Sequence, residues 1–116
     1  MEPKLQWLQQ NLSLTDEELT KMICRHPILF SYSIDSNLEL TLNFYINALG
    51  KDEALALVKR NPGAFGRSLE KRLKPRLEEA QRVGMVIDYM CLYHIIFCTN
   101  DKWDMKIKLI LKRRLT

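Results

Sequence analysis

Cysteine and histidine side chains recur at helical spacing near the C-terminal end of the chain. Cys91, His94 and Cys98 would place two thiols and one imidazole on one face of a helix, and zinc accepts these ligands. Structural zinc sites usually draw ligands from two short knuckles, however, and no fourth ligand is evident. Cysteine is also a common core residue. We therefore favour a core helix over a metal site, and we predict that Cys24, Cys91 and Cys98 are unpaired and metal-free.

Catalytic arrangements find little support in the sequence. Glu78 and Glu79 are paired carboxylates, but adjacent helical positions point apart, which favours a solvated face. His26 has no cysteine nucleophile or carboxylate partner near it in the sequence. Phosphate-binding loops, dinucleotide fingerprints and nucleophile elbows do not occur. We predict no enzymatic activity, no cofactor and no small-molecule substrate.

Basic residues concentrate in one stretch, Lys59–Arg76, which holds seven of the 18 lysines and arginines beside a single acid, Glu70. Residues 1–58 and 77–105 are net acidic, and the tail from Lys106 to Thr116 is basic again. Positive charge in two blocks of an otherwise acidic chain favours a surface field directed at a polyanion. From charge alone, solvated basic faces are the simpler interpretation.

Phosphate groups are the ligands that these basic side chains would bind. Lysine and arginine neutralise phosphates and release counterions, which gives affinity with little sequence information. A helix expected to start at Pro75 would add amide donors to such a site. The alternative for each arginine is a structural ion pair with an acid of a neighbouring repeat, such as Glu39 or Glu78. The candidate nucleic-acid-binding residues are Arg60, Arg67, Arg72, Lys74 and Arg76, followed by Lys59 and Lys71.

An internal repeat of about 35 residues organises the elements that carry these bases. The segment HPILFSYSIDSNLEL, from His26 to Leu40, aligns with NPGAFGRSLEKRLKP, from Asn61 to Pro75. A period of this length is typical of a solenoid of stacked helices. The matched residues include Pro27 with Pro62, Phe30 with Phe65, Leu38 with Leu73, and Arg25 with Arg60.

Capping signals and helical periodicity place the helices. Thr15–Glu18 and Ser36–Glu39 both match the capping-box pattern that begins a helix. Each repeated proline should follow the end of a second helix, and the connector from Ile28 to Ile34 is expected to be non-helical. We expect Gly50 to be a left-handed cap. Because period-two alternation is absent, the sequence predicts an all-α fold.

The aligned phenylalanines carry a further expectation. If the repeat is real, Phe30 and Phe65 should be buried at equivalent places in successive units, because each ring would fill the wedge between stacked helix pairs.

We predict a single domain over residues 1–116, because this length suits one modest core. No apolar run is long enough to span a membrane, and no targeting segment is visible. The expected parts are repeat 1 at 5–40, repeat 2 at 41–75, a partial repeat 3 at 76–98 and a basic C-terminal helix at 99–116.

That basic helix is predicted to cap the solenoid. A repeat stack must cover its last apolar face, and this helix carries an apolar stripe. The same stripe with a basic flank also fits a membrane-surface helix or a phosphate-contacting one. We favour capping. The stripe consists of Trp103, Ile107, Ile110 and Leu111.

These features resemble the mTERF family, named for mitochondrial transcription termination factors. Each unit has a helix, a second helix ending before proline, a turn of the form Ser-(Ile/Leu)-x-x-x-Leu, and a next helix ending in Leu-Gly or Val-Gly. The segments that carry the resemblance are LSLTDEELTKMICRHPILFSYSIDSNLEL and LNFYINALGKDEALALVKRNPGAFGRSLEKRLKPRLEEAQRVG. The resemblance covers residues 5–84 and indicates a short or truncated member with about two and a half repeats.

The resemblance implies a right-handed superhelix of helical repeats with a basic concave groove. It also implies binding to double-stranded DNA or structured RNA in mitochondria or chloroplasts, in transcription termination or regulation, or in RNA processing. Self-association through exposed repeat ends is expected, and membrane binding is not. The rival function is a small protein–protein adaptor without direct nucleic-acid binding.

The functional hypothesis makes a structural demand. If the bases contact phosphates, four of them should lie on one exposed surface together with bases of the tail from Lys106 to Arg114. Charge solvation alone does not require that the fold join the two blocks. The four residues are Arg67, Arg72, Lys74 and Arg76.

Overall fold

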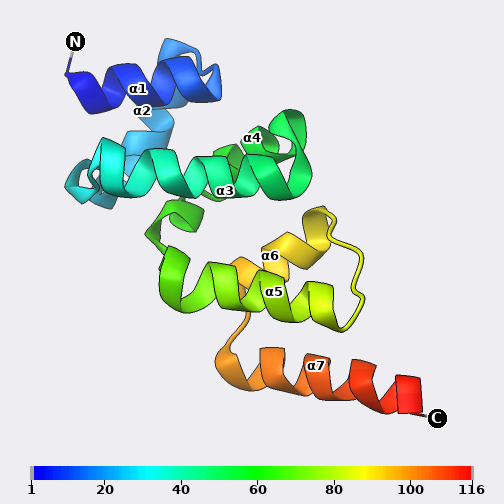
Figure 1. Ribbon diagram of the computed structural model, residues 1–116. Helices are drawn as coiled ribbons and strands as arrows, with labels where there is room; N and C mark the ends of the chain where they lie inside the picture. Colours follow the sequence, from blue (N-terminus) through cyan, green and yellow to red (C-terminus); the bar gives the residue numbers. More distant parts are fainter. Residues whose placement is uncertain (1, 116) are drawn as a thin grey trace. The chain divides into compact units, whose positions relative to one another are not determined.

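The structure is a computed structural model that describes the main chain of residues 2–115 and the side chains of residues 2–113. Helices make up its regular structure, and no strand occurs within the described main chain, so the predicted all-α class is confirmed (Figure 1). The α-helices are α1 (Pro3–Leu12), α2 (Asp16–Arg25), α3 (Glu39–Leu49), α4 (Lys51–Arg60), α5 (Lys74–Arg82), α6 (Tyr89–Phe97) and α7 (Asn100–Leu115).

Two connectors of identical design join the helices, one repeat apart. A 3-10 helix follows the second helix of each repeat, as η1 (Pro27–Ser31) and η3 (Pro62–Gly66). A π-helical turn then leads into the next α-helix, as η2 (Ile34–Leu38) and η4 (Leu69–Leu73). The backbone repeats closely where each connector starts: φ and ψ are −134° and 65° at His26, and −134° and 70° at Asn61.

Serine caps each π-helical turn, which corrects the predicted position of the second capping box. The Ser33 hydroxyl accepts the amide of Ser36 at 3.3 Å, and the Ser68 hydroxyl accepts the amide of Lys71 at 3.1 Å. Ser36 therefore lies inside the helical turn and is not its cap. The Ser36–Glu39 pattern predicted the wrong cap residue, because Ser33, three residues earlier, has the extended backbone conformation that a cap requires.

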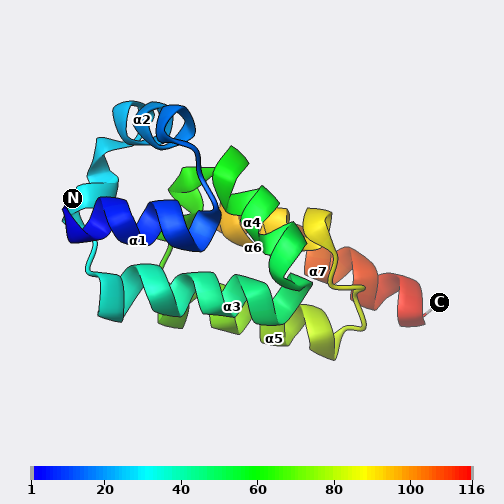
Figure 2. The same cartoon turned by 90° about the horizontal axis from the view of Figure 1, so that it is seen from above.

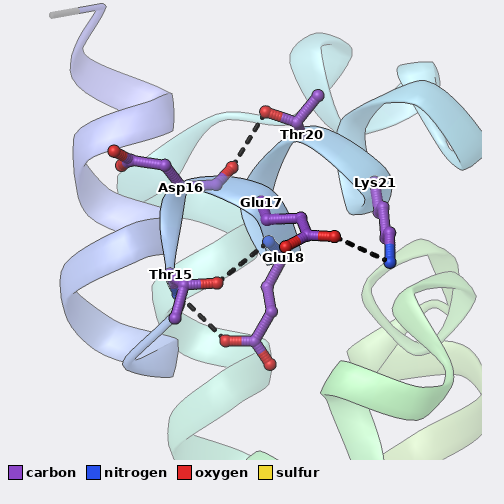
Figure 3. Close-up of polar contacts among 6 residues, drawn as sticks. All are labelled: Thr15, Asp16, Glu17, Glu18, Thr20 and Lys21. Carbon is purple, nitrogen blue, oxygen red and sulfur yellow. Dashed lines mark hydrogen bonds and ion pairs between the residues drawn. The ribbon is translucent and has the colours of Figure 1, made fainter.

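The first capping box forms as predicted. The Thr15 hydroxyl accepts the Glu18 amide at 3.1 Å, and a Glu18 carboxylate oxygen accepts the Thr15 amide at 2.9 Å (Figure 3). These two bonds satisfy main-chain donors that the first turn of a helix leaves unpaired. They fix the start of α2.

Phe30 and Phe65 do not share an environment, so the expectation of equivalent burial is wrong, and the repeat holds for the backbone of the two connectors but not for these rings. Phe65 is fully buried and meets the ring of Trp7 edge-on, with 6.4 Å between ring centroids. Phe30 is 40% exposed, and Leu29 fills the interior of the first connector instead. The connector itself is a 3-10 helix where the sequence predicted non-helical chain.

Glycine makes the sharp turn between α3 and α4 that Figure 2 shows. Gly50 has φ 90° and ψ 162°, a region that only glycine occupies readily. The cap is therefore glycine-dependent as expected, but its ψ differs from that of a left-handed helical residue. This turn lets α3 and α4 pack together as a pair.

The chain forms two compact units, Met1–Gly66 (unit 1) and Arg67–Thr116 (unit 2). The core of unit 1 includes Tyr45, which is fully buried and donates its hydroxyl to the Ala64 carbonyl oxygen at 2.6 Å. In unit 2, the buried face of α6 supplies Leu92, Ile95 and Ile96. A single domain over residues 1–116 stays a prediction. Among the described helices, none combines the length and apolar character needed to cross a bilayer.

Candidate functional site

Arg76 is buried against the end of α6, and the prediction of an exposed surface is wrong for this residue. Only 6% of Arg76 is exposed. Its Nη1 donates to the carbonyl oxygens of Ile95 at 3.0 Å and Cys98 at 2.8 Å, and its Nη2 donates to Asn100 Oδ1 at 2.8 Å. A helix leaves its last carbonyls without main-chain donors, and a cation is favourable at that end. The Arg76 guanidinium supplies both the missing hydrogen-bond donors and the positive charge at the end of α6.

Arg72 binds the same helix end from η4. Its Nη1 donates to the carbonyl oxygens of Ile96 at 3.2 Å and Cys98 at 2.9 Å, and the residue is half-buried. Arg72 and Arg76 thus share the Cys98 carbonyl oxygen. The structure brings these two predicted residues together, but their guanidinium groups donate to carbonyl oxygens of the protein itself and, from Arg76, to the Asn100 side chain.

The charge of Arg76 is retained in this setting. Burial lowers the pKa of the Arg76 guanidinium from its ordinary value, and the neighbouring charge of Arg72 lowers it further, while Asp104 acts in the opposite direction. Arginine nevertheless stays protonated in proteins, because its ordinary pKa is so high. The buried group is therefore a permanent cation that acts as a hydrogen-bond donor.

Arg76 also fixes the start of α7. Its guanidinium carbon lies 5.3 Å from the ring centroid of Trp103, which is 2% exposed. Trp103 Nε1 in turn donates to Glu79 Oε1 at 2.7 Å. The predicted inward stripe is correct for Trp103 and Ile107, but Leu111 is 44% exposed. Leu111 lies roughly 80° around the helix from Trp103, at the edge of the packed face.

The other predicted bases of unit 2 remain on the surface. Arg67 is exposed and lies over the Phe97 ring, 5.4 Å from its centroid. Lys74 forms an ion pair with Glu70 at 2.7 Å, and Lys71 is exposed. Of the expected tail bases, Lys106 contacts His94, while the side chain of Arg114 lies outside the described residues.

A cleft of about 170 Å³ between α2 and α4 gathers basic side chains in unit 1. Lys59 and Arg60, both predicted from the sequence, lie at the end of α4 and line one side. Lys21, Arg25 and His26 line the other side. These three were missed as site residues, although the repeat alignment already matches Arg25 with Arg60 and could have identified the pair.

One carboxylate lies in the cleft, and it is already engaged. The Glu18 carboxylate closes the capping box, and the Thr15 amide is the main cause that lowers the pKa of Glu18, with a smaller contribution from the charge of Lys59. Lys21 pairs with Glu17 at 3.3 Å in an exposed salt bridge (Figure 3), a kind of pair that contributes little. The cleft is therefore predominantly basic.

The chain also carries three cysteine thiols and a second histidine, His94, none of which lines the basic cleft of unit 1. Cys24, Cys91 and Cys98 are free thiols, and burial raises the pKa of Cys91. His94 Nδ1 lies 2.7 Å from Lys106 Nζ on α7. Among the described residues, no group of three or more His, Cys, Asp or Glu side chains is arranged to hold a metal ion.

Acidification should weaken unit 2 through His94. Burial lowers the pKa of His94, the charge of Lys106 lowers it further, and Asp88 opposes both. The unfolded chain then binds a proton below about pH 6.5 that the folded chain binds less readily, so stability is complete above that pH and is lost as the pH falls below it.

Urea unfolding followed by Trp103 fluorescence, with Trp7 replaced by Phe, checks this dependence. The free energy of unfolding should fall between pH 7.5 and 5.5 in the parent chain and stay nearly level in His94→Gln. An equal fall in His94→Gln would show that other groups cause it.

Comparison with known proteins identifies a related family. The mTERF family model matches residues 1–104, most of the chain. No solved structure matches the chain significantly.

Proposed function

The chain belongs to the mTERF family, and from that premise we propose that it binds double-stranded DNA or structured RNA through phosphate contacts and thereby regulates organellar gene expression. mTERF proteins are helical solenoids that bind nucleic acids, and the repeated connectors of this chain fit that architecture. The proposed processes are transcription termination or regulation, and RNA processing. The proposed compartment is the mitochondrion or the chloroplast.

The basic cleft between α2 and α4 is the observation that carries the proposal. Five basic or imidazole side chains line it with one carboxylate, and that carboxylate is engaged in the helix cap. Lysine and arginine bind phosphate by charge and release its counterions, which gives affinity on any sequence. The residues that we propose as the main contacts are Lys21, Arg25, Lys59 and Arg60.

Unit 2 adds a second set of proposed contacts with different roles. Arg67 and Lys71 are exposed and can reach phosphates, and Lys74 can do so if it leaves Glu70. The guanidinium groups of Arg72 and Arg76 donate hydrogen bonds to carbonyl oxygens at the end of α6. We therefore assign them first to holding α6 and α7 in place, which revises the role that the sequence suggested.

A salt titration of binding tests the proposal. The whole chain is mixed with labelled DNA and RNA duplexes of matched length, each in two unrelated sequences. The logarithm of the binding constant should fall linearly with the logarithm of salt concentration, with a slope of roughly −3 or steeper for a cleft of this charge. Little difference is expected between unrelated sequences of one duplex type.

The same experiment judges the adaptor alternative. Binding to neither duplex, or binding with a slope near zero, would contradict phosphate recognition. The chain would then be better explained as a protein-binding module.

A further inference from the structure

The basic cleft of unit 1 is too small for a length of nucleic-acid strand and suits one compact anionic group. Its volume of about 170 Å³ is below the roughly 300–1,000 Å³ of pockets that enclose a whole small molecule. Side chains of α2 line one side of it and the end of α4 lines the other, so cations from both helices meet in one space. A single phosphate group fits this description.

The cations at the cleft exceed the charge of one internal phosphate. A phosphodiester within a strand carries one negative charge, whereas a terminal phosphate monoester carries about −1.5 to −2 at pH 7. Each cation attracts the ligand in proportion to the ligand's charge, so the cleft favours the monoester. The Glu18 carboxylate opposes this gain. Even without Lys21, which forms the ion pair with Glu17, three other cations line the cleft.

A second hollow, of about 640 Å³, adjoins the cleft and has room for a nucleoside. Glu18, Lys59 and Arg60 line both spaces, so the hollow begins where the cleft ends. One face of α4 forms its wall, since the residues there follow at helical spacings of three and four. The residues on that face are Asp52, Leu55, Ala56 and Lys59.

Charge orients a nucleotide across the two spaces. Asp52 lies near the start of α4 and Arg60 at its end, so the hollow becomes acidic away from the cleft. The Asp52 carboxylate repels a phosphate but accepts hydrogen bonds from the hydroxyl or amino groups of a sugar or base. Leu55 and Ala56 supply apolar surface between the two charges. The phosphate therefore fits the cleft, and the nucleoside fits the hollow.

We propose that the cleft binds the terminal phosphate monoester of a nucleic-acid strand, with the terminal nucleoside in the adjoining hollow. The inference rests on the proposed function, because it concerns the same ligand at the same cleft. It adds a preference for strand ends that bear a phosphate over ends that bear a hydroxyl group. A 5′-phosphate and a 3′-phosphate share this chemistry, and the experiment separates them.

Four duplexes of one sequence test the preference by fluorescence anisotropy with the whole chain, using a dye on an internal base. The first bears 5′-phosphates, the second 3′-phosphates and the third hydroxyl groups at all ends. The fourth is closed by a hairpin loop at each end and has no strand end. We expect one of the phosphorylated duplexes to bind about tenfold or more tightly than the hydroxyl-ended duplex. The hydroxyl-ended and closed duplexes should bind alike.

Two double variants tie the preference to the cleft. Arg25→Ala with Arg60→Ala should bring the ratio of the affinities for phosphorylated and hydroxyl ends close to one. The matched control, Arg67→Ala with Lys71→Ala, removes two exposed cations of unit 2. It should leave the ratio unchanged even where both affinities fall. All four positions are exposed, so the unfolding midpoint should change little.

A terminal abasic residue tests the hollow. A duplex that keeps the preferred terminal phosphate but lacks the last base should bind about threefold or more weakly than the complete duplex, because the apolar wall of the hollow then stays uncovered. Equal binding of the abasic and complete ends would show that the nucleoside does not occupy the hollow.

The results separate this inference from the proposed function. Equal, strongly salt-dependent binding of phosphorylated and hydroxyl ends would overturn the inference and leave the proposed function standing. A preference that persists in Arg25→Ala with Arg60→Ala would place the strand end at another surface and would also overturn it. Binding to none of the four duplexes would contradict the proposed function as well.

Discussion

Replacing Arg76 by alanine should lower the free energy of unfolding of unit 2 by roughly 2–4 kcal/mol, because hydrogen bonds to a charged group contribute about 1.5–3 kcal/mol and the truncation leaves buried carbonyl oxygens without a donor. The substitution leaves the Ile95 carbonyl oxygen without this donor and removes the cation from the Trp103 ring. It also opens a cavity at a buried position. Urea unfolding followed by Trp103 fluorescence in a Trp7→Phe background measures the loss.

Two further variants make this test specific. Arg82→Ala removes an exposed arginine from the same helix and should change the stability by less than about 1 kcal/mol. Arg76→Lys keeps the charge but not the planar fork of donors, so it should recover only part of the stability. Wild-type stability in Arg76→Ala would show that α6 and α7 do not depend on the guanidinium.

Removing the repeat-matched pair Arg25 and Arg60 should produce the largest effect on nucleic-acid binding. Both side chains line the basic cleft. If each contacts one phosphate, the double alanine variant should lower the magnitude of the salt slope by about two, since each phosphate contact accounts for about one. Binding should weaken to a similar degree on unrelated sequences, because phosphate contacts carry no base information.

Stability and position provide the controls for that variant. Arg25 and Arg60 are exposed, so the unfolding free energy should change by about 1 kcal/mol or less. Lys51→Ala removes an exposed base of the same unit that does not line the cleft, and it should leave the slope close to that of the parent chain. An unchanged slope in the double variant would move the phosphate site away from the cleft.

Local sequence rules predicted the helices well because helix ends depend on residues near one another in the chain. The Thr15–Glu18 box, the prolines at both connectors and the Gly50 turn are all readable within a few residues. The capping-box rule failed at Ser36, because Ser33, three residues earlier, is the residue whose hydroxyl caps the turn. Only the backbone conformation at Ser33 separates the two possibilities.

Repetition in the sequence also determined the design of the connectors, since the same residue types recur at the same spacing. It did not determine burial. Phe65 is covered because Trp7 of an earlier helix meets it, whereas Phe30 at the matched position stays 40% exposed. Burial depends on which neighbours a repeat has, and the alignment of one repeat with the next does not contain that information.

The sequence by itself determined the all-α class, the family resemblance and the concentration of charge between Lys59 and Arg76. The tertiary structure alone decided where each of those charges lies and which groups it contacts. In the folded chain, Arg60 lines a basic cleft together with Arg25, whereas Arg76 is buried and donates to a carbonyl oxygen at the end of α6. The physical reason is that a guanidinium can donate either to ligands at the surface or to carbonyl oxygens that a helix end leaves unpaired. Which of them it meets depends on chain segments about 20 or more residues away that only folding brings near.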